Sequence, residues 1–145
     1  MKALLQRVSR ASVSVNAKCI GEIEQGLLVL LGLDKADDQP AADRMLDKLL
    51  AYRVFADSEG RMNGSVTDVD GGVLLISQFT LSADTRKGLR PSFSSAMPPG
   101  EAVALYDYFL SQLRHRHPRV AAGEFGVDMQ VSLVNDGPVT FLLEI

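Results

Sequence analysis

The stretch Gly26–Leu33, GLLVLLGL, is apolar at every position except its two glycines. Alternate side chains of a strand point to opposite faces of a sheet, so a continuous apolar run is typical of a strand that is buried on both faces. A second run of this kind, Val73–Phe79 (VLLISQF), follows the turn Asp70-Gly71-Gly72. The two runs predict central strands.

Alternating patterns predict further strands around this centre. Val13 and Val15 alternate with serines, and the apolar positions of residues 127–133 alternate with polar ones. The segment Val139–Ile145 is expected as the last strand. By composition alone, Asn135-Asp136-Gly137-Pro138 is a hairpin turn between the last two strands.

Two segments carry the period of an amphipathic helix. From Ala42 to Leu50 the apolar residues recur at i, i+3, i+4, i+7 and i+8. Pro98-Pro99-Gly100 begins a second periodic segment, which Pro118 ends. The expected fold is α+β, with a single domain over residues 1–145. A largely antiparallel curved sheet or β-barrel would be covered by two main helices.

Composition excludes several classes of protein. The chain has 145 residues, 46% of them hydrophobic, with a net charge of −3, which is typical of a folded domain and not of a disordered one. The single cysteine, Cys19, excludes a disulfide scaffold and favours the cytoplasm. No apolar run approaches the roughly 20 residues of a membrane span, and Gln6 and Arg7 interrupt any signal-peptide core. We therefore expect a soluble cytoplasmic protein without a membrane partner.

The usual catalytic motifs are absent, including the G-x-S-x-G elbow, so an α/β-hydrolase esterase is disfavoured. His115 and His117, the only histidines, lie in Arg114–Pro118 at a helix end, where cations interact favourably with the helix dipole. We expect a solvated helix terminus there. A metal-dependent hydrolase using the two histidines stays a minor alternative, and no metal or cofactor is expected.

Two polar stretches are the candidates for function. Ser77-Gln78-Phe79-Thr80 ends a buried strand, where hydroxyl and amide groups need hydrogen-bond partners and could hold a carbonyl or an oxyanion. A strand fraying into a polar loop is the alternative. Arg86, Lys87, Arg90 and Phe93 lie in one loop, which suits contact with phosphates and stacking on a base. Here the alternative is a solvated loop.

Taken together, these motifs resemble the D-aminoacyl-tRNA deacylase family, of the bacterial type. The likeness extends over the whole chain and includes S-Q-F-T-L at residues 77–81 and N-x-G-P-V-T at residues 135–140. Further matching stretches are Gln6-Arg7-Val8, Gly26–Val29, Lys87-Gly88, Arg90–Phe93, Tyr106-Asp107 and Met129-Gln130-Val131.

The resemblance implies a homodimer that hydrolyses the ester between a D-amino acid, or glycine, and the acceptor end of tRNA, as chiral proofreading in translation. Gly137-Pro138 would be a cis dipeptide, inserted into the partner subunit's pocket, where its carbonyls exclude an L side chain. Arg7 would help to hold this dipeptide. Ser77, Gln78, Phe79 and Thr80 would form the floor around the aminoacyl group. Candidate RNA contacts are Arg86, Lys87, Arg90 and Met129.

The mechanism implied for such a substrate needs no strong base, because an aminoacyl ester is already activated. Each donor placed on the developing oxyanion gives about 10²–10³ in rate, and water or the 2′-hydroxyl of the terminal adenosine would assist. Thr80 has no activating neighbour in the sequence, so we expect it to position the substrate and not to act as a nucleophile. A dimeric module that binds the RNA end without catalysis stays an alternative.

Overall fold

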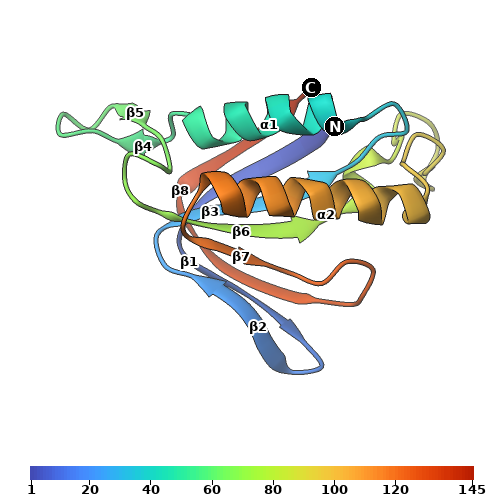
Figure 1. Cartoon of the computed structure of the whole chain (residues 1–145), viewed down its shortest axis with the longest axis horizontal. Coiled ribbons are helices and arrows are strands. Elements are labelled where there is room, and N and C mark those ends of the chain that lie inside the picture. The colour runs from blue at the N-terminus through green and yellow to red at the C-terminus, as the bar shows by residue number, and fades with distance from the viewer.

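The centre of the fold is a pair of buried strands, β3 (Gly26–Gly32) and β6 (Gly72–Ser77), in a computed structural model that describes residues 1–145. The two strands are parallel, with Gly26 opposite Gly72. They approach so closely at this end that a Cβ atom on Gly26 would lie 1.9 Å from the carbonyl oxygen of Gly72. The two apolar runs therefore form the middle of the sheet, as the sequence predicts (Figure 1).

The longest strands form the antiparallel part of the sheet. Strand β1 (Lys2–Val15) pairs over nearly its whole length with β8 (Gln130–Glu144). On its other edge, β1 pairs first with β3 and then with β2 (Lys18–Ile23). Strand β1 is thus hydrogen-bonded to three other strands.

The sheet nearly closes into a barrel. The short strand β7 (Val120–Ala122) pairs with β6, and a Cβ atom on Gly21 of β2 would lie 3.1 Å from the carbonyl oxygen of Ala122. The pairs β3–β6 and β6–β7 are parallel, because the chain returns through a helix between the strands of each pair. The other pairs are antiparallel, so the predicted α+β class with a largely antiparallel, barrel-like sheet is confirmed.

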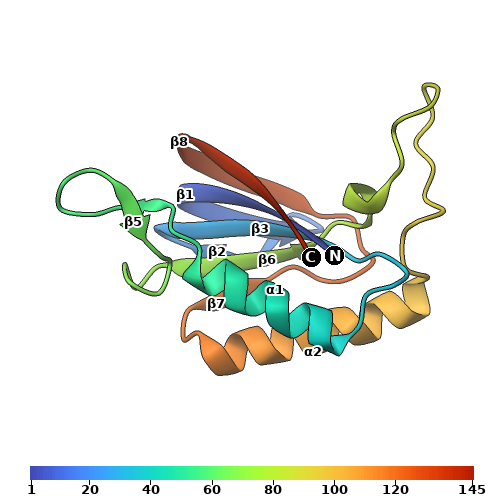
Figure 2. The ribbon, with the colours of Figure 1, turned by 90° about the horizontal axis from the view of Figure 1, so that it is seen from above.

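Both predicted helices are present, and they lie side by side on one face of the sheet (Figure 2). Helix α1 (Gln39–Ala51) is capped by Asp38, whose side chain accepts a hydrogen bond of 2.8 Å from the N–H of Ala41. Helix α2 (Pro99–Arg116) begins at the second of two consecutive prolines and ends before Pro118. Neither helix has the length and apolar character that crossing a membrane requires.

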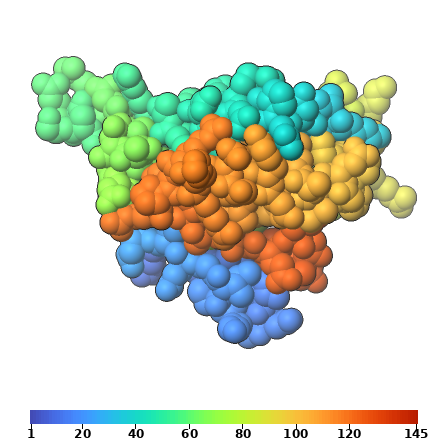
Figure 3. Space-filling view, viewed as in Figure 1, coloured from blue at the N-terminus to red at the C-terminus, as the bar shows by residue number.

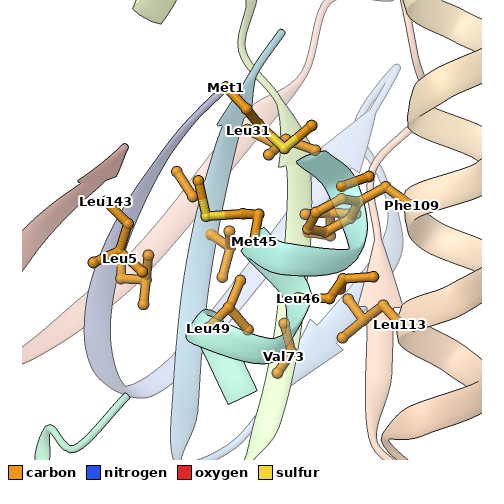
Figure 4. Packing of buried hydrophobic residues seen from close by; sticks show 14 of the residues in the cluster. Met1, Leu5, Leu31, Met45, Leu46, Leu49, Val73, Phe109, Leu113 and Leu143 are labelled. Atoms are coloured by element: carbon orange, nitrogen blue, oxygen red, sulfur yellow. The ribbon is translucent and has the colours of Figure 1, made fainter. Parts of the chain in front are cut away.

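The main hydrophobic core lies between the helices and the sheet. Leu5 and Leu143 from the sheet meet Met45 and Leu49 from α1, and Phe109 reaches the same cluster from α2 (Figure 4). In the space-filling view the two helices form one continuous surface over this core (Figure 3). The periodic positions in the sequence are therefore the buried ones.

The hairpin that composition predicts at residues 135–138 is wrong. Strand β8 runs straight through these residues and stays paired with β1 on both sides of them. The register passes from Gln6 opposite Thr140 to Val8 opposite Asn135, so residues 136–139 form a bulge opposite Arg7. The turn-forming residues therefore lie in a bulge and not in a hairpin. Because β8 pairs with β1 on both sides of the bulge, the chain does not reverse there.

The expectation of a solvated terminus for both histidines is also corrected. His115 is exposed, whereas His117 is 3% exposed, and its Nε2 lies 2.7 Å from the carbonyl oxygen of Gly71. His117 follows the last residue of α2, where the chain turns back toward β7. This packing of the helix end under the Gly71 turn explains its burial, which a charge pattern does not reveal.

Three small elements extend from the sheet. Strands β4 (Phe55–Ala56) and β5 (Met62–Gly64) pair as a separate hairpin at one end of the molecule, called here the β4–β5 arm. The short 3₁₀ helix η1 (Phe79–Ser82) follows β6 and begins where the sequence predicts the end of that strand. The loop between η1 and α2 stands away from the body of the molecule (Figure 2).

Candidate active site

Ser77, Gln78, Phe79 and Thr80, called here the 77–80 cluster, lie together where β6 ends. The N–H of Gln78 donates a hydrogen bond of 2.7 Å to the carbonyl oxygen of Leu31, which continues the pairing with β3 for one residue. The chain then turns into η1, and Phe79 is 60% exposed. The structure thus brings all four predicted residues of this cluster to one end of the sheet.

A pocket of about 540 Å³ opens beside the 77–80 cluster. Two aromatic pairs belong to its walls, Phe79 with Phe93 at a centroid distance of 5.1 Å and Tyr106 with Phe125 at 5.6 Å. Its other lining residues are Leu31, Leu33, Ser77, Gln78, Ala96, Met97, Pro98, Pro99, Ala102 and Gly126. The pocket is mostly apolar and has polar groups on the side of Ser77 and Gln78, which suits a flat aromatic ligand with a polar reacting group.

Tyr106 and Phe125 were not among the predicted site residues. Tyr106 lies on the apolar stripe of α2, so the helical period assigns it to the core, and it is indeed only 2% exposed. Its hydroxyl donates to the carbonyl oxygen of Leu75 at 3.3 Å. Burial raises the pKa of Tyr106 to about 12, so this hydroxyl stays protonated and serves as a wall of the pocket, not as a base.

Thr80 has no group beside it that could activate it as a nucleophile. The one side chain that hydrogen-bonds its Oγ1 is Gln78, whose amide Nε2 donates to it and cannot accept a proton. The histidines lie at the far end of the 18-residue helix α2, which is about 27 Å long. Neither histidine lines the pocket, so a hydrolase that uses His115 and His117 at this pocket does not fit the structure.

Gly137 and Pro138 lie exposed in the bulge of β8, and the peptide bond between them is cis. Arg7 holds the bulge from β1. Its Nε donates to the carbonyl oxygen of Asp136 at 2.7 Å, and its Nη1 donates to the carbonyl oxygen of Val54 at the same distance. The predicted contact between Arg7 and this segment is therefore present, and it extends to the base of the β4–β5 arm.

The two candidate clusters do not meet within one chain. Lys2 lies beside Gly32, and its ammonium donates to the carbonyl oxygen of Leu81 in η1 at 3.3 Å. Arg7, five residues further along β1, holds the bulge. At about 3.3 Å per strand residue, the 77–80 cluster and the Gly137-Pro138 dipeptide lie about 17 Å apart along the strand.

The predicted RNA contacts differ in their surroundings. Arg86 forms a double hydrogen bond with Asp84, at 2.9 and 2.8 Å, and this contact holds the pKa of Asp84 well below its usual range. Lys87 and Arg90 are exposed and form no ion pair. Met129 is half-buried and packs on the smaller hydrophobic cluster around β1 and β6.

The comparisons with known proteins agree with this geometry. A family model described as D-Tyr-tRNA(Tyr) deacylase matches residues 4–144. Proteins named D-aminoacyl-tRNA deacylase from Cellvibrio japonicus and Stutzerimonas stutzeri are 64% and 62% identical to the chain over 144 residues, 99% of each chain in both cases. The chain belongs to the D-aminoacyl-tRNA deacylase family.

Solved structures share the fold of this deacylase. A structure titled "c-Myc DNA Unwinding Element Binding Protein" aligns with a TM-score of 0.96 and 44% identity, covering 100% of this chain and 99% of that chain. A probable eukaryotic D-amino acid tRNA deacylase aligns with a TM-score of 0.86 and 18% identity, covering 99% and 98%. The predicted family is thus confirmed, and so is the enzyme class, a hydrolase acting on the ester bond of aminoacyl-tRNA in translation proofreading.

Proposed function

We propose that this deacylase acts as a homodimer in which each active site combines two subunits. The 77–80 cluster of one subunit would form the floor, and the Gly137-Pro138 dipeptide of the other would enter the pocket from above. The observation that carries the proposal is the separation of about 17 Å between the two clusters along the strands of one chain. A two-fold partner can supply the missing half of each site, because a symmetric interface presents the same surfaces twice.

In the proposed site, the dipeptide selects against L-amino acids by steric exclusion. Gly137 and Pro138 are exposed and their bulge is held by Arg7, so their carbonyls can present a fixed wall. A discrimination of 10³ corresponds to about 4 kcal/mol, which a backbone clash supplies more readily than a missing contact. D-amino acids and glycine would pass this wall, since neither places a side chain on its side.

Hydrolysis is proposed to be assisted by the substrate. The ester is activated, so main-chain and side-chain donors of the 77–80 cluster need only hold the carbonyl and its developing oxyanion. The attacking water would be oriented by the cluster and by the 2′-hydroxyl of the terminal adenosine. Thr80 would position the substrate, which agrees with its single side-chain partner, Gln78.

The acceptor end of tRNA is proposed to approach over the loop between η1 and α2. Lys87 and Arg90, with Arg86 nearby, would contact phosphates, and the ring of Phe79 offers a stacking surface for a base. Met129 would contribute at most a packing contact. The proposed location is the cytoplasm, where aminoacyl-tRNA is made and used.

The first experiment compares deacylation of D-tyrosyl-tRNA and L-tyrosyl-tRNA by the purified protein, with a chelator present. Rapid loss of the D ester alone supports the proposal and excludes metal catalysis. If both esters survive while a non-hydrolysable D-aminoacyl adenosine still binds tightly, the protein is a module that captures the RNA end. Hydrolysis of both esters at equal rates would contradict the proposed exclusion of L-amino acids by the dipeptide.

A second experiment tests the shared site. One variant with a defective dipeptide, such as Pro138→Ala, is mixed and refolded with one defective in the cluster, such as Gln78→Ala. With Gln78→Ala in excess, nearly every intact cluster of a Pro138→Ala subunit faces an intact dipeptide of a Gln78→Ala subunit. The D/L rate ratio, low in Pro138→Ala alone, is therefore expected to return toward the wild-type value. A ratio that stays at the Pro138→Ala value contradicts a shared site.

A further inference from the structure

The bulge of β8 contains a buried residue, Val139, whose main chain is held by a side chain. Residues 136–139 of β8 stand opposite the single residue Arg7. Val139 is only 7% exposed, so its N–H and carbonyl need partners within the protein. Both groups bond to one side chain, that of Asn135. Its Oδ1 accepts from the N–H of Val139 at 2.8 Å, and its Nδ2 donates to the carbonyl oxygen of Val139 at 3.1 Å.

We propose that Asn135 is the positioning residue that fixes the Gly137-Pro138 dipeptide and thereby sets the discrimination between D and L esters. This inference rests on the proposed function, in which the dipeptide is the wall against L side chains. Asn135 does not touch substrate in this proposal. It acts through the shape of the bulge.

The side-chain amide of Asn135 bonds to Val139 as a residue of a neighbouring strand would. A primary amide carries a donor and an acceptor side by side, so it can close a ring with the N–H and the carbonyl of one residue. The same Nδ2 also lies 3.1 Å from Oε1 of Gln6 on β1 and 3.2 Å from Oγ1 of Thr140. The bulge is thus anchored to β1 by Gln6 at its one end and by Arg7 in its middle.

The dipeptide rests directly on this contact. A Cβ atom on Gly137 would lie 2.1 Å from the nitrogen of Val139 and 3.1 Å from Oδ1 of Asn135. The Asn135–Val139 hydrogen bond therefore runs under the Cα atom of Gly137. Any change in the length or orientation of this bond shifts Gly137, and with it the carbonyl wall, while the 77–80 cluster about 17 Å away stays in place.

The sharpest test is Asn135→Asp, which keeps the shape and the acceptor but removes every donor. An ionised aspartate would point an oxygen at the carbonyl oxygen of Val139, which can only accept a hydrogen bond. A neutral carboxylic acid regains one donor and can close the ring with Val139 again. Because only the neutral form bonds to this carbonyl, we expect the pKa of the new carboxyl to be raised.

The measurement is the ratio of the deacylation rates of D-tyrosyl-tRNA and L-tyrosyl-tRNA between pH 5 and pH 8. In Asn135→Asp we expect this ratio to fall about tenfold at pH 8, the equivalent of one lost hydrogen bond, and to recover on acidification. The neighbouring charged groups are Arg7 on β1 and Asp136 on β8, 3.6 Å apart. Both are present in the wild type, whose own pH profile corrects for their titration.

Asn16→Asp is the matched control, because it makes the same change in the turn between β1 and β2, where the asparagine side chain has no hydrogen bond. It should keep the wild-type ratio at every pH. Pro138→Ala distinguishes the role of Asn135 in positioning from the role of the dipeptide as the wall. If Pro138→Ala lowers the ratio and Asn135→Asp does not, Asn135 is not the positioning residue, although the dipeptide is the wall. If neither variant changes the ratio, the proposed role of the dipeptide fails first.

A second variant covers poor folding of Asn135→Asp. Gln6→Met removes the acceptor on β1 at nearly constant length and leaves the ring with Val139 intact. It should lower the D/L ratio about threefold, with a smaller effect on the rate for the D ester. An equal loss of both rates in this variant, with the ratio unchanged, would mean that the contact is merely structural and would overturn the inference.

Discussion

The guanidinium of Arg7 donates from Nε to the main-chain oxygen of Asp136 at 2.7 Å, one peptide before the Gly137-Pro138 bond. The same group donates from Nη1 to Val54 at the base of the β4–β5 arm, and its side chain is 15% exposed. One side chain thus fixes two segments that are far apart in the sequence. Its charge is compensated by two carbonyl dipoles and by the nearby carboxylate of Asp136.

Arg7→Lys should separate selectivity from catalysis. Lysine keeps the charge, but its single ammonium does not reproduce the fork that bonds two carbonyls in different directions. We expect the D/L rate ratio to fall about tenfold, since a hydrogen bond to a charged group contributes about 1.5–3 kcal/mol. Steady-state deacylation of both esters measures this. Arg44→Lys on the exposed face of α1 is the control, and an unchanged ratio in Arg7→Lys would show that the bulge holds without the fork.

Gly137→Ala should be one of the most damaging single-methyl changes in the chain. The added Cβ atom would lie 2.1 Å from the nitrogen of Val139, so the bulge must move. We expect loss of D/L discrimination and a drop in melting temperature, measured by thermal unfolding. Gly100→Ala is the matched control, because a Cβ atom there has no neighbour within 4 Å and the position is helical. A gain of about 0.5–1 kcal/mol is expected for the control. If the two variants have the same melting temperature and the same D/L ratio, the close contact between a Cβ atom on Gly137 and Val139 does not exist in the protein.

Thr80→Val tests the role of the hydroxyl in catalysis. If Thr80 positions substrate through Gln78, the loss in kcat should be about tenfold or less, and Thr80→Ser should restore it. Removal of a covalent nucleophile costs on the order of 10⁴-fold or more. Single-turnover deacylation of D-tyrosyl-tRNA distinguishes the two cases. A loss of the larger size would assign Thr80 as the nucleophile.

The cationic loop should show its role in the salt dependence of binding. Lys87 and Arg90 are exposed and unpaired, so replacing either with alanine should weaken tRNA binding and lower the slope of log Kd against log salt by about 1. Arg86→Ala should have a smaller effect, because Asp84 already neutralises Arg86 in the free protein. Filter binding at several salt concentrations gives the slopes. Identical slopes for the wild type and Lys87→Ala would place the RNA elsewhere.

Much of the fold follows from sequence patterns because burial and local structure coincide there. The apolar residues from Ala42 to Leu50 recur with the helical period and face the core, and the run from Gly26 to Leu33 is apolar on both faces of a buried strand. Both predictions are confirmed. Composition alone predicts a hairpin at residues 135–138, which the family resemblance replaces with an inserted dipeptide. The hairpin is wrong, because the decisive partner, β1, lies about 130 residues away in the sequence. Turn-forming residues describe a local bend and do not reveal whether a long strand continues beyond it.

The sequence predicts the candidate site only in part, for a related reason. The polar end of β6 is visible as Ser77 and Gln78 after an apolar run, and the structure places both at the pocket. Tyr106 and Phe125 have no such signal, since their apolar rings are equally suited to a core. Asn135 looked like a turn residue. Its actual role, pairing with the peptide of Val139, depends on a gap in the strand ladder that no sequence pattern displays.

The position of the dipeptide inside β8, and not at the tip of a loop, has a consequence for its motion. Strand β8 is paired with β1 on both sides of the bulge, and β1 is in turn bonded to β2 and β3. The two flanks of the bulge therefore separate only when part of the central sheet breaks, and the free energy of that opening approaches that of global unfolding. In the proposed function, the fidelity of the enzyme is thus tied to the cooperativity of its fold. Amide hydrogen exchange should find Val139 among the slowest residues, together with the strands of the core.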